Sequence, residues 1–481
     1  MISQDLMAPI MFGGLIVFLL IGYPAAFSLG AVGLFFSFIG IEMGMFQPTF
    51  LQALPDRVFG ILSNDLLLSI PFFTFMGAIL EKCGLAEDML EGLGQLFGPI
   101  RGGLAYAVII VGAILGAITG TVAASVIAMG LISLPIMLRY GYNPRVATGV
   151  IAASGTITQL IPPSLVLIVL ADQLGKSVGD MYAGAIGPSI IQIVLFCLFI
   201  FFLSIFRPQD VPALPPEARP KIDWKLFKKI LWGIVPSIAL IFLVLGTILM
   251  GLATPTEGGA MGSVGALVLA AMNKRLQKTL VWDAMTSTMR INAMVIFILI
   301  GSTVFGLAFR GVDGDLWIEQ LLTGLPGGQI VFLIVVNLFV FFLAFFLDYF
   351  EIAFIIIPLL APVAQKLGID LIWFGVLLGA NMQTSFMHPP FGFALFYLRG
   401  VAPKSVKSSD IYYGALPWVG LQLILVAIII FIPETVTYFV DQPAAVFDTN
   451  GPSIDPLAGV EQNEIAVDSS SEIERQLREN K

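Results

Sequence analysis

Apolar stretches separated by short polar segments run through the first 432 residues of the chain. Most of them have roughly 15 to 25 residues, the length of a helix that crosses the hydrocarbon core of a bilayer. The stretches lie near residues 7–21, 25–40, 66–83, 104–137, 147–171, 183–206, 230–250, 256–272, 291–309, 329–366, 371–398 and 411–432. This pattern predicts an all-α polytopic membrane protein.

Two of these stretches, 104–137 and 329–366, are too long for one span and have small or polar residues at their centres. The first centre is Thr119–Thr121, and the second contains Asp348. We expect each stretch to form two half-length helices that enter and leave on the same side of the membrane, as a re-entrant hairpin. Close packing of small residues between helices is the alternative role of the first centre.

Two other stretches, 147–171 and 371–398, contain tandem prolines. Because two consecutive prolines remove two backbone donors and clash with the preceding turn, each helix must open there. Opened backbone persists inside a bilayer only where it is buried in protein or lines a cavity. The freed carbonyls, with Thr and Ser hydroxyls beside them, make a suitable oxygen cage for Na⁺. A proline kink satisfied by neighbouring helices is the alternative, but two matching breaks favour a functional role.

The composition supports a membrane protein and excludes several other classes. Hydrophobic residues make up 58% of the chain, charged residues 12%, and the mean hydropathy is +0.95. A soluble domain usually has about a quarter charged residues. The net charge of −8 argues against nucleic-acid binding, and Cys83 and Cys197 are too few for a disulfide scaffold. Nine acidic and three basic residues lie in 441–481, so the acidity belongs mainly to a polar tail.

Lysine and arginine predict the orientation of the spans. Seventeen of the 24 lie in segments that we assign to the cytoplasm, namely 82–101, 139–145, 207–229, 274–290 and 399–407. This distribution requires both hairpins to be re-entrant, and it places the N-terminus and the acidic tail outside.

The two halves of the chain match each other at an offset of about 225 to 230 residues. The matches are Gly77 with Gly301, Gly102-Gly103 with Gly327-Gly328, Pro135 with Pro358, Pro162-Pro163 with Pro389-Pro390, and the turn 184–188 with 414–417. The first hairpin follows the cytoplasmic Arg101, and the second lies between Arg310 and Lys366 on the outside. The halves are therefore predicted to be an inverted repeat. Such repeats, with interrupted helices in matching positions, point to the binding site of a secondary transporter.

The repeat defines five expected regions. These are N-terminal scaffold helices (1–65), the first repeat with its hairpin and broken helix (66–206), a cytoplasmic loop with two scaffold helices and an amphipathic arm (207–290), the second repeat (291–432), and an acidic tail (433–481). Three amphipathic stretches, 85–97, 221–231 and 276–290, are expected to lie along the membrane surface. They anchor the scaffold or, alternatively, form a docking face for another subunit.

Four polar residues have specific predictions of their own. An intramembrane carboxylate is expensive unless paired, so Asp348 is a functional candidate, whereas Glu351 is expected to reach the interface. Thr254 is predicted to cap a helix that has Pro255 at its first position. His388, the sole histidine, is expected to support the opened helix through a hydrogen bond.

These motifs together resemble the large membrane subunit (DctM type) of tripartite ATP-independent periplasmic (TRAP) transporters, from about residue 7 to residue 432. The most specific ones are the first hairpin centre with the run 154–164, the turn 253–258, and the Phe346-Leu347-Asp348 centre with its following broken span. The resemblance implies an elevator-type Na⁺-coupled importer of organic carboxylates in the bacterial inner membrane, with both termini periplasmic. It also implies a separate four-helix (DctQ-type) membrane subunit and a periplasmic (DctP-type) binding protein.

The resemblance further implies sites but no organic cofactor and no metal besides sodium. One Na⁺ site falls on Thr119, Gly120, Thr121, Gly155, Thr156 and Thr158, a second on Asp348, Asn381 and Thr384, and the substrate lies between them against Thr121, Ser164 and Ser385. A stand-alone divalent-anion/sodium symporter or a Na⁺/H⁺ exchanger of similar architecture is the main alternative. An ATP-driven pump, a membrane enzyme and a pure assembly subunit are disfavoured, because no phosphate-binding loop or protease motif is present and a scaffold needs no paired polar breaks.

Overall fold

The computed structural model describes residues 4–219, 224–389 and 392–440, and every regular element in these ranges is a helix. The expected all-α class is confirmed. Six helices in the described ranges are long and apolar enough to cross a membrane, or eight spans if each of two bent helix pairs counts as one. The predicted tail beyond residue 440 lies outside the described residues.

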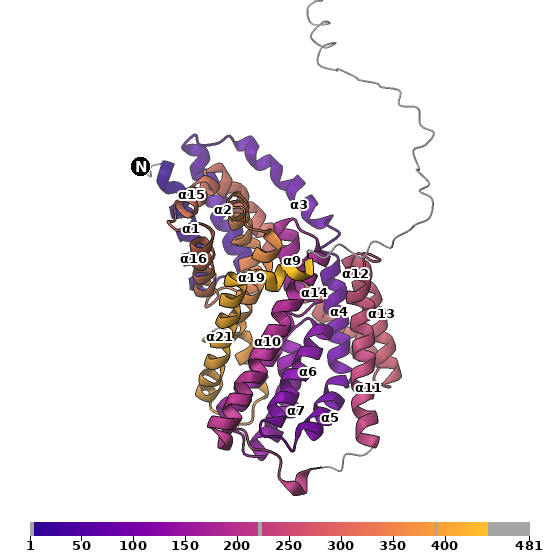
Figure 1. The fold of residues 1–481 in the computed structure, drawn as a ribbon. Coiled ribbons are helices and arrows are strands. Elements are labelled where there is room, and N and C mark those ends of the chain that lie inside the picture. Colours follow the sequence, from indigo (N-terminus) through magenta and orange to yellow (C-terminus); the bar gives the residue numbers. More distant parts are fainter. Residues whose placement is uncertain (1–3, 220–223, 390–391, 441–481) are drawn as a thin grey trace, which may run out of the picture. The chain divides into compact units, whose positions relative to one another are not determined.

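The first half of the chain begins with three helices and continues into a span, a hairpin, a broken helix and a long span (Figure 1). The bounds are α1 Gln4–Ile21, α2 Ala25–Glu42, η1 Pro48–Ala53, α3 Leu54–Leu62, α4 Ser69–Lys82, α5 Leu85–Phe97, α6 Gly103–Thr119, α7 Val122–Arg139, α8 Pro144–Thr156, η2 Ile157–Gln159, α9 Leu165–Leu174 and α10 Val178–Phe206. Local signals explain several ends, because the Asn143 side chain caps α8 and Gly175, with φ of 62°, ends α9.

A connecting region joins the two halves. It comprises η3 Pro208–Asp210, η4 Pro216–Ala218, α11 Trp224–Ile241, the π-helical turn η5 Phe242–Gly246, α12 Thr247–Leu249 and α13 Pro255–Met272. The predicted cap of α13 is confirmed: Thr254 Oγ1 accepts from Glu257 N at 3.2 Å, and the Glu257 carboxylate accepts from Thr254 N at 2.8 Å.

The second half repeats the order of elements found from α4 to α10. Its helices are α14 Lys278–Gly311, α15 Gly314–Thr323, α16 Gly328–Leu343, α17 Tyr349–Ile355, α18 Ile357–Lys366, α19 Leu371–Met382, η6 Gln383–Met387, α20 Phe393–Val401, α21 Ser408–Phe431 and α22 Glu434–Val440. In each half, a span is followed by a short helix, a hairpin, an interrupted helix and a final long helix. The two bent pairs are α4 with α5, at 61°, and α17 with α18, at 53°.

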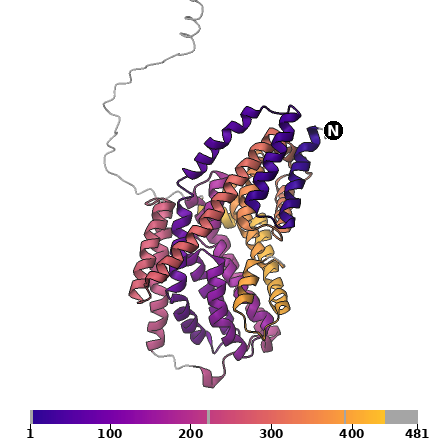
Figure 2. The same ribbon diagram turned by 180° about the vertical axis from the view of Figure 1, so that it is seen from behind.

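Two predicted surface helices are continuous with the spans that follow them. Helix α11 runs from Trp224 through the predicted end of its amphipathic stretch, and residues 221–223 lie outside the described ranges. Helix α14 has 34 residues and includes most of the stretch expected as a separate arm. Figure 2 shows α14 crossing its neighbours obliquely as one helix. No glycine or proline interrupts it between Lys278 and Ile300, so the backbone has no local reason to stop.

The start of the predicted tail is also structured. Helix α22 packs against α10 so closely that a Cβ on Gly187 would lie 2.0 Å from the carbonyl oxygen of Thr435. The repeat-marking glycines have the same kind of role. A Cβ on Gly77 would lie 2.0 Å from the Thr119 carbonyl oxygen, and one on Gly301 would lie 2.4 Å from that of Ala26. Glycine is required where these backbones meet.

Candidate functional site

Both proline-containing helices open where the sequence predicts. Helix α8 ends at Thr156, passes through the single turn η2, and resumes as α9 after Ser164, whose side chain accepts a hydrogen bond from Val166 N at 3.2 Å. Helix α19 ends at Met382, passes through η6, and resumes as α20. The interrupted segments 157–164 and 383–388 are buried apart from partly exposed Ile161, so their backbones are surrounded by protein.

Both hairpins turn at the predicted centres. At the first tip, Gly120 adopts φ of 60° and Thr121 is extended, and α7 begins at the next residue. At the second tip, Asp348 caps α17 by accepting a hydrogen bond from Glu351 N at 2.8 Å, while the Glu351 carboxylate accepts from Asp348 N at 3.0 Å. We expected the Glu351 side chain to extend toward the membrane interface. It instead folds back onto the hairpin tip.

The two tips and the two openings meet at one cavity of about 300 Å³. The first tip contributes residues 120–123, and the second contributes residues 348–350. Gln159 comes from the first opening and Phe386 from the second. Of the described residues that line the cavity, Asp348 is the only charged one. The cavity therefore combines one carboxylate, hydroxyl and amide groups, and aromatic walls, a set suited to a small polar ligand.

The first predicted sodium cluster is compact. The hydroxyls of Thr119, Thr156 and Thr158 donate to backbone carbonyls of Leu115, Ala153 and Gly155 at 2.9, 2.9 and 3.0 Å. Gly116 on α6 leaves no room for a side chain beside Thr158, since a Cβ there would lie 2.9 Å from its Cα. A Cβ on Gly155 would lie 2.2 Å from Val126 Cγ2 of α7, so a side chain is excluded there as well. The structure thus places the hairpin directly against the opening.

The second predicted cluster is divided. Asn381 Nδ2 donates to the carbonyl and side-chain oxygens of Asn337 on α16, at 2.7 and 3.0 Å, and Thr384 Oγ1 donates to Asn381 O at 2.8 Å. Asp348 lies with the tips at the cavity, whereas Asn381 and Thr384 do not line it. Asn337, which sequence reasoning missed, is the contact that ties the second hairpin to the second opening.

The predicted substrate residues differ in position. Thr121 lines the cavity, but Ser164 and Ser385 are buried beside it, and their neighbours Leu165 and Phe386 line it instead. His388 stacks on Phe345, with ring centroids 4.1 Å apart, where we expected a hydrogen-bonded support.

Four buried polar side chains form a network that the motifs did not reveal. Gln383 Nε2 donates to Thr156 O at 2.8 Å and thereby joins the two openings. Gln422 on α21 donates to Thr156 Oγ1 at 3.2 Å, and Gln192 on α10 donates to Gln383 Oε1 at 3.0 Å. Thr156 and Gln383 are related by the repeat offset, and so are Gln192 and Gln422. The sequence did contain a signal for this network, because Gln192 and Gln422 are isolated polar residues at matching positions of two long apolar helices.

Several buried oxygens near the openings have no hydrogen-bond partner among the described residues. They include Ser154 Oγ, Gln159 Oε1 and Asn381 Oδ1. An unpaired buried acceptor costs about 1–3 kcal/mol. A bound water or cation relieves that cost, so these oxygens are candidates for binding one.

Comparisons with known proteins agree with this architecture. The family model for the DctM component of the tripartite ATP-independent periplasmic transporter matches residues 12–435. A C4-dicarboxylate TRAP transporter large permease protein from Rhodobacter capsulatus is 29% identical over 89% of this chain and 97% of its own length. An isethionate TRAP transporter permease protein, DctMQ, from Oleidesulfovibrio alaskensis is 26% identical over 90% of this chain and 66% of its own length.

The fold itself is similar to a solved transporter. The crystal structure of the YdaH transporter of Alcanivorax borkumensis aligns with a TM-score of 0.57 at 15% identity, over 81% of this chain and 88% of that one. Because the family model spans most of the described helices, the chain belongs to the DctM family of tripartite ATP-independent periplasmic transporters and is a transporter permease, not an enzyme.

Proposed function

We propose that this chain is the large permease of a Na⁺-coupled importer of small organic carboxylates in the bacterial inner membrane. The observation that supports it best is the convergence of both hairpin tips and both openings on the cavity containing Asp348. A substrate bound there contacts segments from both halves of the chain. A displacement of these segments as one unit then transfers it across the membrane, which is the elevator mechanism, with the two halves arranged as an inverted repeat.

Sodium binding is proposed at the two openings. The Thr156 and Thr158 hydroxyls donate their hydrogens to carbonyls and each accepts one hydrogen bond, from Gln422 Nε2 at 3.2 Å and from Gln159 Nε2 at 3.4 Å, so each oxygen keeps one lone pair for a cation. Asn381 Oδ1 is buried and unpaired among the described residues, which suits a second ion. Asp348 supplies the negative charge nearest to the cavity. A cation bound near it reduces the cost of moving an anionic substrate into the membrane.

Two partner proteins are part of the proposal. The isethionate relative is a DctMQ protein, and its greater length leaves room for a second component. We expect the corresponding small four-helix subunit as a separate chain beside this one. Family membership supports a periplasmic binding protein that delivers the substrate. We also propose that both termini are periplasmic, as the distribution of lysine and arginine along the chain predicts.

Uptake by proteoliposomes tests the proposal. They contain this chain with its small subunit and are given labelled succinate and other carboxylates, with and without an inward Na⁺ gradient and the binding protein. Uptake that requires both supports the tripartite importer. Uptake that requires Na⁺ alone supports a stand-alone symporter, and uptake that requires neither refutes both.

A charge-removing variant tests the assignment of Asp348. Asp348→Asn retains the helix cap but removes the charge. We expect Na⁺ affinity to fall about ten- to hundredfold, because a contact with a charged group contributes about 1.5–3 kcal/mol. Asp370→Asn is the matched control, since Asp370 caps α19 through Trp373 N at 2.7 Å and lies away from the cavity. Equal Na⁺ dependence of both variants removes Asp348 from the site.

A further inference from the structure

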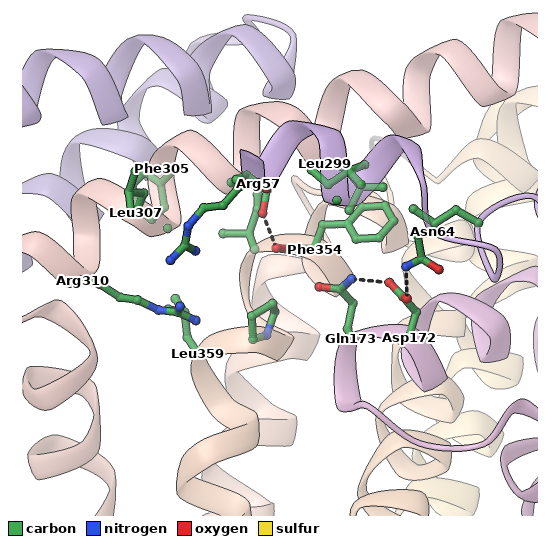
Figure 3. Close-up of a pocket in the computed structure, with 18 residues that line it drawn as sticks. Arg57, Asn64, Asp172, Gln173, Leu299, Phe305, Leu307, Arg310, Phe354 and Leu359 are labelled. Atoms are coloured by element: carbon green, nitrogen blue, oxygen red, sulfur yellow. Dashed lines mark hydrogen bonds between the residues drawn. The ribbon is translucent and has the colours of Figure 1, made fainter. Parts of the chain in front are cut away.

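A second cavity, of about 350 Å³, lies between α3, the end of α9, α14 and the α17–α18 bend (Figure 3). Arg57 of α3 and Arg310 of α14 line it, and Figure 3 shows their side chains directed toward the same part of the space. Resting on the proposed function, we propose that this cavity is an outer capture site in which the two arginines bind the carboxylate of the substrate before it reaches the cavity between the hairpin tips.

The charges in the cavity are arranged for an anion. In the described part of the chain, neither guanidinium has a carboxylate oxygen within 4.0 Å, whereas Lys366 on α18 is paired with Glu319. Both arginines are exposed, so water screens the repulsion between their charges, and an anion bound between them offsets it further. Arginine is also suited to hold a carboxylate through two parallel hydrogen bonds.

One carboxylate, that of Asp172, also lines the cavity, but it lies at the end of the cavity away from the two arginines. Asp172 accepts hydrogen bonds from Asn64 Nδ2 at 2.7 Å and from Gln173 Nε2 at 2.8 Å. Figure 3 shows these three residues together, away from the two arginines. The amides therefore satisfy Asp172, and the arginine end of the cavity keeps its positive charge.

The capture site shares its walls with the first cavity. Helix α14 contributes Met294 to the inner cavity and Ser302 to the outer one, which are about 12 Å apart at 1.5 Å per residue. Helix α9 contributes Leu165 and Asp172 in the same way, about 10 Å apart. The two cavities thus approach each other to about two helical turns along walls common to both, whereas Arg310 itself lies 16 residues, or about 24 Å, beyond Met294 on α14.

The size of the outer cavity suits a small organic acid. Ligand pockets of this kind have volumes upward of about 300 Å³. Apolar groups such as Phe354 and Leu359 also line the cavity. A ligand with a carboxylate and a short carbon skeleton has a complementary surface for each part of the lining.

The charge of the cavity is tested without any transport measurement. Gly60 lines the cavity one turn from Arg57, and a Cβ there meets no atom within 4 Å, so Gly60→Cys introduces an accessible thiol. Cys83 and Cys197 are first replaced by serine. The introduced thiol is then reacted with an anionic and a cationic methanethiosulfonate reagent. We expect the anionic reagent to react on the order of tenfold faster, because a positive cleft concentrates anions.

Two comparisons assign that preference to the arginines. Arg57→Gln and Arg310→Gln should remove most of it, whereas Lys176→Gln, which changes an exposed cation outside the lining, should leave it intact. Ser63→Cys, an exposed thiol at the end of α3 that does not line the cavity, should show little preference. Equal rates of the two reagents with the Gly60→Cys variant, when both arginines are present, overturn the proposal.

Uptake kinetics separate this inference from the proposed function. If the site captures substrate, both arginine variants raise the KM for succinate about tenfold and leave the maximal rate nearly unchanged. The arginines could instead bind a carboxylate of the binding protein. In that case the two arginine variants weaken association of the binding protein and leave the KM for free substrate unchanged, and this result overturns the capture site. An anion preference of the Gly60→Cys thiol with no Na⁺-driven uptake leaves the capture of an anion standing and refutes the transport function.

Discussion

Gln383 Nε2 donates a 2.8 Å hydrogen bond to the carbonyl oxygen of Thr156, across 227 residues of sequence. The two residues occupy equivalent positions in the two openings, but they differ in type, so only the Gln383 side chain donates a hydrogen bond to the backbone of the other opening. It connects the first proposed sodium site to the segment that holds the second. A glutamine without partners would be costly at this depth, and its neighbours Gln192 and Gln422 complete the network.

Replacing Gln383 should therefore destabilise the protein. Gln383→Ala leaves the Thr156 carbonyl and the Gln192 amide unpaired, at a cost of about 1–3 kcal/mol for each buried group. The midpoint of thermal unfolding in detergent should fall clearly. Gln95→Ala is the control, because Gln95 contacts Glu91 in an exposed position. An unchanged midpoint for Gln383→Ala would show that the network contributes no stability.

The hydroxyl of Thr158 is expected to contribute to Na⁺ binding. Thr158→Val keeps the shape of the side chain but removes the oxygen, so the half-saturating Na⁺ concentration should rise about three- to tenfold, since one neutral contact contributes about 0.5–1.5 kcal/mol. Thr158→Ser should restore it. Thr74→Val is the matched control, because Thr74 is buried on α4 and donates to Ile70 O at 2.7 Å in the same manner. A Na⁺ titration of uptake checks all three, and equal curves for the two valine variants contradict the assignment.

The position of the first hairpin tip depends on Gly77. A Cβ at this residue would lie 2.0 Å from the Thr119 carbonyl oxygen, so Gly77→Ala must displace the tip or α4. We expect lower thermal stability and reduced uptake. Gly30→Ala on α2 meets no atom within 4 Å and should be neutral or slightly stabilising, as alanine is favoured over glycine inside a helix. If the two variants have the same thermal stability and the same uptake rate, the close approach of α4 to the hairpin tip is not required for function.

Features governed by short-range rules were predictable from the sequence. Tandem prolines open a helix whatever surrounds them, and a Thr-Pro-x-Glu run caps α13 because its bonds lie within four residues. Helix ends at the two surface stretches were not predictable in this way. An amphipathic pattern fixes which face of a helix is apolar, and gives no information on whether the helix bends at the membrane surface.

The partners of the site residues were also beyond prediction. Asn337 and Gln422 lie far in sequence from the openings that they contact, and only the packing of α16 and α21 brings them there. The family resemblance named Ser164 and Ser385 as substrate contacts, but the direction of a side chain at an opened backbone depends on the local turn. Ser164 turns back to cap α9, and that bond keeps its hydroxyl out of the cavity.

The unbroken course of α14 has a consequence for how the protein sits in lipid. At 1.5 Å per residue its 34 residues extend about 51 Å, well beyond a hydrocarbon core of about 30 Å. Exposed Trp282, Met285 and Met289 continue its apolar surface toward its N-terminal end. A rod of this length fits the bilayer by tilting or by leaving it at one end. Since α14 forms a wall of both cavities, the thickness of the surrounding membrane bears on the angle at which both are held.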